Sequence, residues 1–534
     1  YIWNIDYVTD IAREYKKLCP SVPIWVGGPE VSYEVEAFLR ENPYIDGVMI
    51  GEGEDTFREL CGYYAHKRKL SDIAGIAFRK NSTGNSTSNR TSVNNAGCKA
   101  DEIVFTSPRP IKNMSEIPFC YDTLDDFSNR IIYYESSRGC PFSCSYCLSS
   151  VDKTLRFRDT RIVKRGLKFF IDQKVPQIKF VDRTFNCNHA HAMELWRFIK
   201  ANDNGVTNFH FEISADLLNQ EELELISDMR PGLIQLEIGV QSTNEVTIKE
   251  IHRTMKLERL KEVVRLIQSG NNIHEHLDLI AGLPYEDYDS FGRSFDEIYE
   301  LKPNQLQLGF LKVLKGSYMF EHAAEYGIVY HDKPPYEVMS TKWLSFDDVI
   351  KIKRVEDMLE VYYNSGQFEI TMKLMECIFD SAFEFFQELG DFYEANGYFG
   401  MSHSRIRRCE ILLEFLALYL HGCDNDAMTS VVLSENDGDR DNTDFDENAQ
   451  IYKMIQESLI FDLYYRENCK SRPVWATDIG SFKHMTHAYC KNGKLSHVEP
   501  FHYIFPDKHT RKLDELPKYH KEPVWALFHY DMRD

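Results

Sequence analysis

Short apolar strands alternate with helical stretches through the middle of the chain. The strand segments RIIYYES, QIKFVD, NFHFEIS, LIQLEIGV, IHEHLDLIAG and NQLQLGFL begin roughly 26 to 46 residues apart. That spacing is the length of a βα unit, so the pattern predicts parallel strands connected by helices. Six units favour a (β/α)6 part-barrel over a closed eightfold barrel. In such barrels, functional side chains gather at the C-terminal ends of the strands.

A shorter α/β pattern opens the chain. An amphipathic helix over residues 6 to 18 is followed by an apolar strand, Val22 to Val26, which runs into two glycines. A second strand, in IDGVMIGEGE, also ends in glycines. Strands that end in glycine loops, with helices between them, predict the C-terminal half of a doubly wound, Rossmann-like domain, and we expect its front half to be missing from this chain. For a lone glycine pair, a simple turn is the plainer interpretation.

The remaining segments complete the expected domain organisation. Residues 81 to 100 are low in complexity and rich in Ser, Thr and Asn, which predicts a disordered insertion. Beyond residue 345 apolar residues recur at helical spacing, which predicts a mainly helical region. The expected α/β protein therefore has four parts, namely residues 1–75 (half a Rossmann-like domain), 76–130 (a linker), 131–345 (a part-barrel) and 346–534 (a mainly helical domain).

Composition and charge narrow the class of protein. The chain has 534 residues, of which 43% are hydrophobic, so we expect a globular multidomain protein. A formal net charge of -21 disfavours a broad phosphate-binding surface, so nucleic acid is not the expected partner. Thirteen irregularly spaced cysteines indicate reduced thiols and one metal site rather than a disulfide framework. With no apolar run of about eighteen residues and no signal peptide, we expect a soluble, cytoplasmic protein.

Three cysteines lie close together in SSRGCPFSCSYCLSS, at Cys140, Cys144 and Cys147. Glycine and proline flank the first of them, so we expect a loop that can turn three sulfurs toward one centre. A structural zinc site would need a fourth ligand, for which Cys120 or Cys187 would have to be recruited from a distance. Iron-sulfur clusters also take thiolates, usually four, so a loop with three cysteines would leave one iron open to a substrate.

The spacing C-x3-C-x2-C, with an aromatic residue before the last cysteine and at the end of the first barrel strand, resembles the radical S-adenosylmethionine (SAM) superfamily. The resemblance covers residues 131 to about 345. It implies that Cys140, Cys144 and Cys147 hold a 4Fe-4S cluster whose open iron chelates the amino and carboxylate groups of SAM. Reductive cleavage of SAM would then give methionine and a 5'-deoxyadenosyl radical, which takes a hydrogen atom from the substrate.

Other residues at the strand ends fit the same resemblance. Tyr146 would lie beside the adenine of SAM, and Asp182, in FVDRTFN, is the nearest equivalent of the residue that receives the amino group. Glu212 and Gln241 stand where ribose or aminoacyl contacts are expected, and Arg253 would neutralise the carboxylate of SAM. The alternative interpretation is a packing aromatic for Tyr146 and hydrogen-bonded barrel-mouth groups for the others.

The resemblance of the central region to the radical SAM superfamily changes the interpretation of the two glycine loops. VGGPE and IGEGEDTF resemble the cobalamin-binding domain of one branch of the superfamily, in which glycines let the cofactor approach the backbone. The implied cobalamin-binding positions are Gly27, Gly28, Gly51, Glu52 and Gly53. The first histidine of the chain is His66, so these loops offer no imidazole as a lower ligand of cobalt. The C-terminal region resembles a domain of unassigned function found in one subgroup of this branch.

Two hypotheses about function follow. The first is a cobalamin-dependent radical SAM enzyme that methylates or rearranges an unactivated carbon of a small-molecule or lipid-like substrate. It would need an electron donor such as flavodoxin or ferredoxin. The second is a non-catalytic iron-sulfur or zinc protein that keeps only the fold. The cysteine triad together with Asp182, Glu212 and Gln241 favours the enzyme, because a structural metal site does not need polar groups at the strand ends.

Overall fold

The computed structural model describes residues 1–80, 102–151, 153–421, 447–467, 472–476, 496–506 and 515–530, together with residues 469, 510 and 513 and apart from residues 122, 125, 126, 128 and 129. The low-complexity insertion expected over residues 81 to 100 lies outside this described part of the chain. The chain forms two compact units. The first comprises Tyr1–Asp287 and Gly309–Ser345, and the second comprises Tyr288–Leu308 and Phe346–Asp534.

The first unit begins with a four-stranded sheet in the order β1-β2-β3-β4. Its strands are β1 (Trp25–Gly27), β2 (Gly47–Met49), β3 (Ile76–Arg79) and β4 (Ile103–Phe105), and its helices are α1 (Ile5–Leu18), α2 (Pro29–Ser32), α3 (Val35–Glu41) and α4 (Glu54–Tyr64). β1 and β2 are parallel, as the doubly wound prediction requires, but β3 and β4 are antiparallel to their neighbours. The expected linker over residues 76–130 therefore contains two strands that extend this sheet.

Apolar side chains cover both faces of this sheet. Val48 of β2 and Ala77 of β3 belong to one cluster, with Ala12 of α1 and Leu39 of α3. Ile76 and Phe78, the neighbours of Ala77 along β3, belong to a second cluster, which Leu60 of α4 completes. Successive residues of a strand point to opposite faces, so this alternation explains how so short a strand joins two layers of helices.

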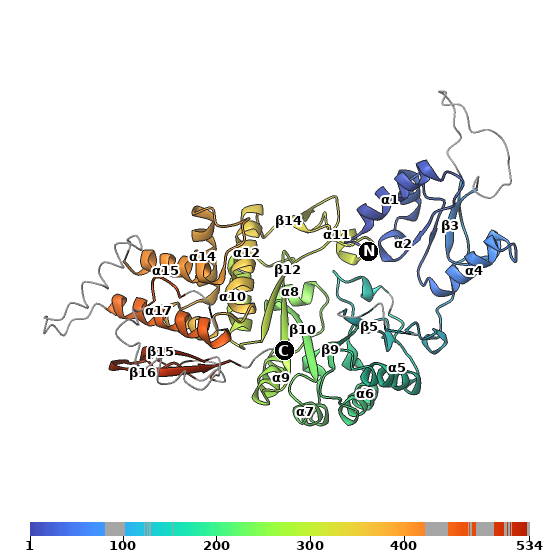
Figure 1. The fold of residues 1–534 in the computed structure, drawn as a ribbon. Helices are drawn as coiled ribbons and strands as arrows, with labels where there is room; N and C mark the ends of the chain where they lie inside the picture. The colour runs from blue at the N-terminus through green and yellow to red at the C-terminus, as the bar shows by residue number, and fades with distance from the viewer. Residues whose placement is uncertain are drawn as a thin grey trace. The chain divides into compact units, whose positions relative to one another are not determined.

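The six predicted strands of the part-barrel form one sheet in the order β12-β11-β10-β9-β8-β5, which confirms the expected architecture. They are β5 (Ile132–Tyr134), β8 (Gln177–Phe180), β9 (Asn208–Ile213), β10 (Ile234–Gln241), β11 (His274–Ala281) and β12 (Gln305–Phe310). The pairs from β5 to β11 are parallel. The connecting helices are α5 (Thr160–Asp172), α6 (His189–Ala201), α7 (Gln220–Ser227), α8 (Glu245–Glu250) and α9 (Leu257–Ser269). Figure 1 shows α5, α6, α7 and α9 along the outer side of this sheet.

The barrel has an apolar outer face and a polar inner face, which β10 shows most clearly. Ile234, Leu236, Ile238 and Val240 are buried, whereas the residues between them are partly exposed. The alternating positions carry glutamine, glutamate, glycine and glutamine. The side chains that face away from the helices are therefore available to line a site.

Short elements complete the first unit. An antiparallel ribbon of β6 (Ser137–Arg138) and β7 (Arg156–Phe157) flanks the cysteine loop, and β13 (Val329–Tyr330) pairs with β14 (Val338–Ser340). The remaining short helices are η1 (Leu70–Asp72), η3 (Met114–Glu116), η5 (Leu148–Ser150), η6 (Phe185–Cys187), η7 (Ala215–Leu217) and α11 (Tyr318–His322).

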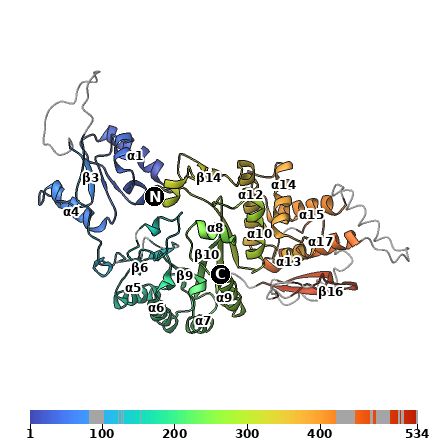
Figure 2. The ribbon, with the colours of Figure 1, turned by 180° about the vertical axis from the view of Figure 1, so that it is seen from behind.

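The second unit is mainly helical, as predicted. Its helices are α10 (Tyr288–Tyr299), α12 (Phe346–Leu359), η8 (Glu360–Asn364), α13 (Glu369–Ile378), α14 (Ala382–Ala395), α15 (Arg405–His421) and α17 (Glu447–Arg466). The sequence analysis missed the antiparallel pair β15 (Ser496–Tyr503) and β16 (Tyr519–His529), which Figure 2 shows beside α17. None of the described helices combines the length and the apolar character that a membrane span requires.

Candidate active site

The chain runs from β5 through β6 into the cysteine loop, and β7, which pairs with β6, follows the loop. Gly139, which precedes Cys140, has a φ of 91°. A Cβ at this position would lie 2.5 Å from the carbonyl oxygen of Thr154, so the loop needs glycine here for both its conformation and its packing. The far side of the loop is fixed by the backbone N–H of Ser145, which donates to the carbonyl of Ile251 at 2.9 Å.

All three thiols of the loop line one cavity of about 180 Å³. Cys140 and Cys144 are buried, and burial raises the pKa of Cys140. Within the described residues, no three His, Cys, Asp or Glu side chains surround a single point as one metal ion would require. The three thiols lie along the wall of one shared space.

Arg253 brings a buried positive charge to the same cavity. Its Nη1 lies 3.2 Å from the hydroxyl of Tyr146 and 3.8 Å from Sγ of Cys144. Its Nη2 donates to the carbonyl of Gly239, whereas its buried Nε has no hydrogen-bond partner in the described structure. Burial opposes the charge of Arg253, but Tyr146 and Cys144 raise its pKa above the usual range. Tyr146 and Arg253, each predicted to contact SAM, thus lie together beside the thiols.

Asp182 is not in the cavity, contrary to the expected contact with SAM. Its carboxylate is fully buried and accepts from the backbone N–H of Ser136 at 2.9 Å, from the Ser136 hydroxyl at 2.7 Å and from the Ser137 hydroxyl. The Ser136 hydroxyl also lies 2.9 Å from Nε2 of His191. The short strand β8 ends two residues earlier, so the chain turns this side chain under the start of the cysteine loop. These hydrogen bonds support the start of the cysteine loop.

Glu212 does line the cavity, and its surroundings favour a proton on its carboxylate. Burial and the neighbouring charge of Glu237 raise the pKa of Glu212 to about 7. Glu237 itself is held ionised, because His210 at 2.7 Å and Lys179 at 2.9 Å outweigh burial and lower its pKa to about 2. Asp278 also lines the cavity, and burial raises its pKa. Glu212 and Glu237 are register partners on adjacent strands, and Glu212 holds a proton far more readily than Glu237 does.

Lys179 and His210 are functional candidates that the sequence analysis missed. They lie opposite each other in the parallel pair of β8 and β9, on the polar inner face of the barrel. The signal was present, because each is a charged or titratable residue within an otherwise apolar strand. Only the pairing of the strands reveals that both reach the same oxygen of Glu237.

Gln241 lines the cavity in a strained backbone conformation. Its φ is 77°, which is unusual for a residue with a side chain, and β10 has an irregular register between Gly239 and Gln241. The buried Oε1 of Gln241 has no hydrogen-bond partner in the described structure. A side chain at Gly239 would collide with the amide of Gln241, so glycine there makes room for it. Strained backbone conformations of this kind persist only where the surrounding structure enforces them, and they are common at functional sites.

The two glycine loops lie at the ends of β1 and β2. Gly28 has a φ of 109° and Gly51 a φ of 75°, and no atom lies within 4 Å of the Cβ that either would carry. The same open space surrounds Gly53, whereas a Cβ on Gly27 would touch the side chain of Met49.

Glu52, which was expected to contact cobalamin, is already engaged by the protein. Its Oε1 accepts from Arg156 at 2.7 Å and from Arg138 at 3.1 Å, and its Oε2 accepts from the backbone N–H of Lys112 at 3.1 Å. Burial opposes the charge, but these hydrogen bonds lower the pKa of Glu52. The carboxylate joins the loop to other parts of the protein instead of standing free.

Comparisons with known families match three regions of the chain. Residues 1–61 match the B12 binding domain, residues 134–298 match the radical SAM superfamily, and residues 324–532 match a family described as a protein of unknown function, DUF4080. The first two matches cover the glycine loops and the cysteine loop, and the third covers the C-terminal region, so the predicted family is confirmed.

Curated relatives share these domains at low identity. An uncharacterized methyltransferase of Pyrococcus horikoshii is 23% identical over 353 residues, which cover 64% of this chain and 71% of the relative. The cobalamin-dependent radical SAM methyltransferase TokK of Streptomyces tokunonensis is 26% identical over 324 residues, which cover 56% of this chain and 44% of TokK. An anaerobic magnesium-protoporphyrin IX monomethyl ester cyclase of Synechocystis is 24% identical over 263 residues, which cover 47% and 48% of the two chains.

A solved structure shares the fold. The cobalamin-dependent S-adenosylmethionine radical enzyme OxsB, solved with aqua-cobalamin and S-adenosylmethionine bound, gives a TM-score of 0.51 at 16% identity over 86% of this chain and 70% of its own. This likeness concerns the fold alone. The chain therefore carries a region that matches the radical SAM superfamily, with a B12 binding domain match before it and a DUF4080 match after it.

Proposed function

We propose that the protein is a radical SAM enzyme that uses cobalamin to methylate an unactivated carbon. One observation carries the proposal: the three loop thiols share a single cavity with a buried arginine and with the polar inner face of the barrel. A metal site that only stabilised the fold would not need Arg253, Glu212 and Gln241 in the lining of the same cavity.

The residues present fit the two cofactors. Three thiols on one wall suit a cluster with one open iron, and the unpartnered Nε of Arg253 suits an anionic ligand beside it. The open space over Gly28, Gly51 and Gly53 suits the close approach of a large planar ring to the backbone. When bound, the cluster supplies one electron for cleavage of SAM into methionine and a 5'-deoxyadenosyl radical, and cobalamin supplies a carrier for a methyl group.

The chain's own side chains bind and orient SAM in this proposal. Arg253 neutralises the carboxylate of SAM, Tyr146 lies against its adenine, and Glu212 and Gln241 accept or donate hydrogen bonds to its ribose or aminoacyl group. Asp182 fixes Ser136 and Ser137, which lead into the cysteine loop. Gly27, Gly28, Gly51 and Gly53 form the backbone surface for cobalamin.

The reaction type is taken from the relatives. Several curated relatives are methyltransferases, and others are cyclases. The chain spans less than half of TokK, so we assign only the class of reaction and leave the substrate as a small molecule or lipid. A donor of the flavodoxin or ferredoxin type would supply the electron for the cluster.

The test is product analysis of anaerobically reconstituted protein with SAM, dithionite and hydroxocobalamin. We expect 5'-deoxyadenosine from the wild type and none from the variant Cys140→Ala, Cys144→Ala, Cys147→Ala, which also loses its iron. Release of S-adenosylhomocysteine in step with 5'-deoxyadenosine supports methyl transfer, whereas 5'-deoxyadenosine alone supports rearrangement or cyclisation. Intact cluster with no nucleoside would favour the non-catalytic hypothesis.

A further inference from the structure

Glu52 joins three separate segments of the first unit. Its Oε1 receives Arg138 of β6 and Arg156 of β7, and its Oε2 receives the backbone of Lys112. The B12 binding domain contributes Glu52 itself, from the loop after β2. All these residues belong to the same compact unit.

The two arginines are also held in place by partners other than Glu52. Arg138 lies opposite Arg156 in the antiparallel ribbon. Arg138 is also paired with Glu135 at 2.7 Å and with Glu54 at 2.9 Å, and Arg156 donates to the carbonyl of Lys112 at 3.1 Å. The side chain of Arg156 is only 13% exposed and that of Glu52 is 21% exposed. Ion pairs of this kind are worth more than surface pairs, because their geometry is fixed and water is partly excluded.

The ribbon in turn carries the cysteine loop. Cys140 follows Arg138 by two residues, and Gly139 between them packs directly on the backbone of Thr154. Because that contact leaves no room for a side chain, the ribbon and the start of the cysteine loop cannot shift independently.

We propose that Glu52 is a positioning residue that fastens the second glycine loop to the cysteine loop through Arg138 and Arg156, so that the two loops keep a fixed separation. The link between the two loops stands on the contacts of Glu52. Its functional meaning rests on the proposed function, because only there do the two loops hold cobalamin and the cluster at a fixed separation. Glu52 therefore acts through the ribbon and touches neither cofactor.

The first glycine loop has its own, separate anchor. Glu30, two residues after Gly28, is buried and accepts a hydrogen bond from the hydroxyl of Tyr336, which is also buried. Nearby, a side chain on Gly316 would overlap the ring of Tyr33. Each of the two glycine loops thus has a nearby glutamate that is bound by a residue outside the loop: Glu30 follows Gly28, and Glu52 lies between Gly51 and Gly53.

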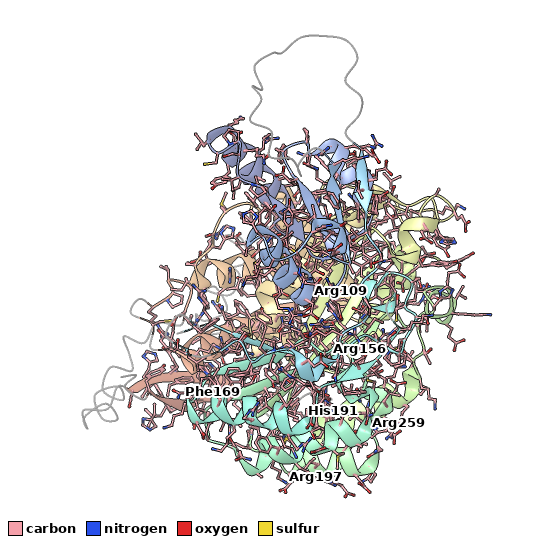
Figure 3. All side chains as sticks on the ribbon, turned by 90° about the vertical axis from the view of Figure 1, so that its right-hand side faces the viewer. Arg109, Arg156, Phe169, His191, Arg197 and Arg259 are labelled. Carbon is pink, nitrogen blue, oxygen red and sulfur yellow. The ribbon has the colours of Figure 1, made fainter. Side chains whose placement is uncertain are left out.

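The chain offers a matched control for Glu52. Arg109, which is 14% exposed, pairs with Glu59 and also donates to Thr56 Oγ1 at 2.6 Å and to the carbonyl of Ala74 at 3.0 Å. The pair of Arg109 and Glu59 is as buried as the pair of Arg156 and Glu52. The partners of Arg109 lie within residues 56–74, so this pair does not reach the cysteine loop. Figure 3 labels both Arg109 and Arg156.

The experiment is hydrogen exchange with mass spectrometry on the full chain with its cluster reconstituted. We expect Glu52→Gln to accelerate amide exchange at least tenfold both in residues 51–54 and in residues 137–158, with the iron content unchanged. Glu59→Gln should leave both segments as in the wild type, and Tyr336→Phe should affect the first glycine loop alone. The double variant Glu52→Gln, Arg156→Gln should show less than the sum of the two single effects, because both changes remove the contact between Glu52 and Arg156.

Three outcomes would overturn the proposal: faster exchange confined to residues 51–54, the same change in Glu59→Gln, or additive effects in the double variant. If Glu52→Gln loses iron, Arg156→Lys decides, because it keeps the positive charge but lacks the planar guanidinium that bonds Glu52 and the Lys112 carbonyl. Faster exchange in both segments of Arg156→Lys supports the proposal, and exchange as in the wild type contradicts it.

A second measurement separates the proposal from the proposed function. Hydroxocobalamin should slow exchange in residues 137–158 of the wild type and have no such effect in Glu52→Gln. Failure of the wild type to bind hydroxocobalamin contradicts the proposed function, and the comparison without cofactor still tests Glu52. Binding by the wild type with equal protection in both proteins contradicts the positioning role.

Discussion

At the residue scale, the carboxylates of the barrel show how environment decides charge. Burial raises the pKa of Asp182 to about 6 despite its hydrogen bonds from Ser136 and Ser137, and burial with the charge of Glu237 raises the pKa of Glu212 to about 7. Glu237 is also buried, but Lys179 and His210 donate to it and lower its pKa to about 2. Three acids on adjacent strands therefore span the range over which a carboxyl group can act as donor, acceptor or fixed charge.

Asp182 gives a prediction about stability and pH. Burial raises its pKa from 3.8 to about 6, so the folded protein holds this proton more tightly than the unfolded chain does. The stability contributed by the protonated form is complete below about pH 4 and is lost as the pH rises through 6. A shift of this size corresponds to about 3 kcal/mol.

Asp182→Asn cannot ionise, so we expect the wild type to lose about 3 kcal/mol of unfolding free energy relative to the variant between pH 4 and pH 7. Denaturant titrations of both proteins across this range measure the difference. Parallel pH profiles for the two proteins would show that the titration of Asp182 is not coupled to folding.

Glu212 gives a prediction about ligand binding. If its carboxylate accepts a hydrogen bond from SAM, affinity should rise as the pH passes through about 7, where the group loses its proton. Glu212→Gln keeps the shape of the protonated form and should bind SAM about tenfold more weakly at pH 8, with no step near pH 7. Calorimetric titration of the reconstituted protein with SAM at several pH values decides it. A step that survives in Glu212→Gln belongs to another group.

At the scale of elements, the ribbon of β6 and β7 gives a prediction about the cluster. Gly139→Ala adds a Cβ 2.5 Å from a backbone oxygen at a φ of 91°, so the cysteine loop has to move. We expect the iron content after reconstitution to fall severalfold. Gly205→Ala is the control, because Gly205 has a φ of 76° but open space around it, so it should cost only about 1 kcal/mol of backbone strain and keep its iron. Equal iron in both variants would contradict the packing argument.

The elements also show what the sequence could predict. The six barrel strands and the cysteine loop were predictable, because alternation and C-x3-C-x2-C spacing are local signals. β3 and β4 were missed because each has only three or four residues beside a polar insertion. β15 and β16 pair across a long separation, which no local pattern reports.

The candidate site was predictable to a different degree at each residue. Cys140, Cys144, Cys147, Tyr146 and Arg253 do come together. The protein contacts of Asp182 and Glu52 were not predictable, because the direction of a side chain just after a strand depends on the turn that follows. Their partners are distant in sequence: Ser136 immediately precedes β6, and Arg156 lies in β7.

At the scale of the whole molecule, the second unit is interleaved with the first. α10 belongs to the sequence of the barrel but packs in the second unit. Its Phe295 lies 5.5 Å from the ring of Phe383 and 6.0 Å from that of Phe386, both on α14. Asp296 of α10 accepts from the hydroxyl of Ser381 at 2.7 Å and from the backbone N–H of Phe383 at 2.9 Å, and so caps the start of α14.

This arrangement predicts the result of removing residues 346–534. The apolar face of α10, with Phe291, Phe295 and Tyr299, would lose its cover and become an exposed aromatic patch. We expect a chain ending at residue 345 to bind the dye ANS strongly and to sediment as an aggregate. A monomeric protein of that length that does not bind ANS would contradict the prediction, because the aromatic side chains of α10 would then be buried elsewhere. The full chain carrying Phe383→Ala should stay monomeric with a lowered melting temperature.

The interleaving also has a consequence for how such a protein can evolve. A gene fusion at residue 345 would join two pieces of which neither is complete, since residues 288–308 lie upstream of the junction but pack downstream of it. The C-terminal region therefore cannot be exchanged between lineages as an independent module. Any ancestor that gained it had to acquire a matching α10 in the same lineage, so the surface of that one helix should record the history of the pairing.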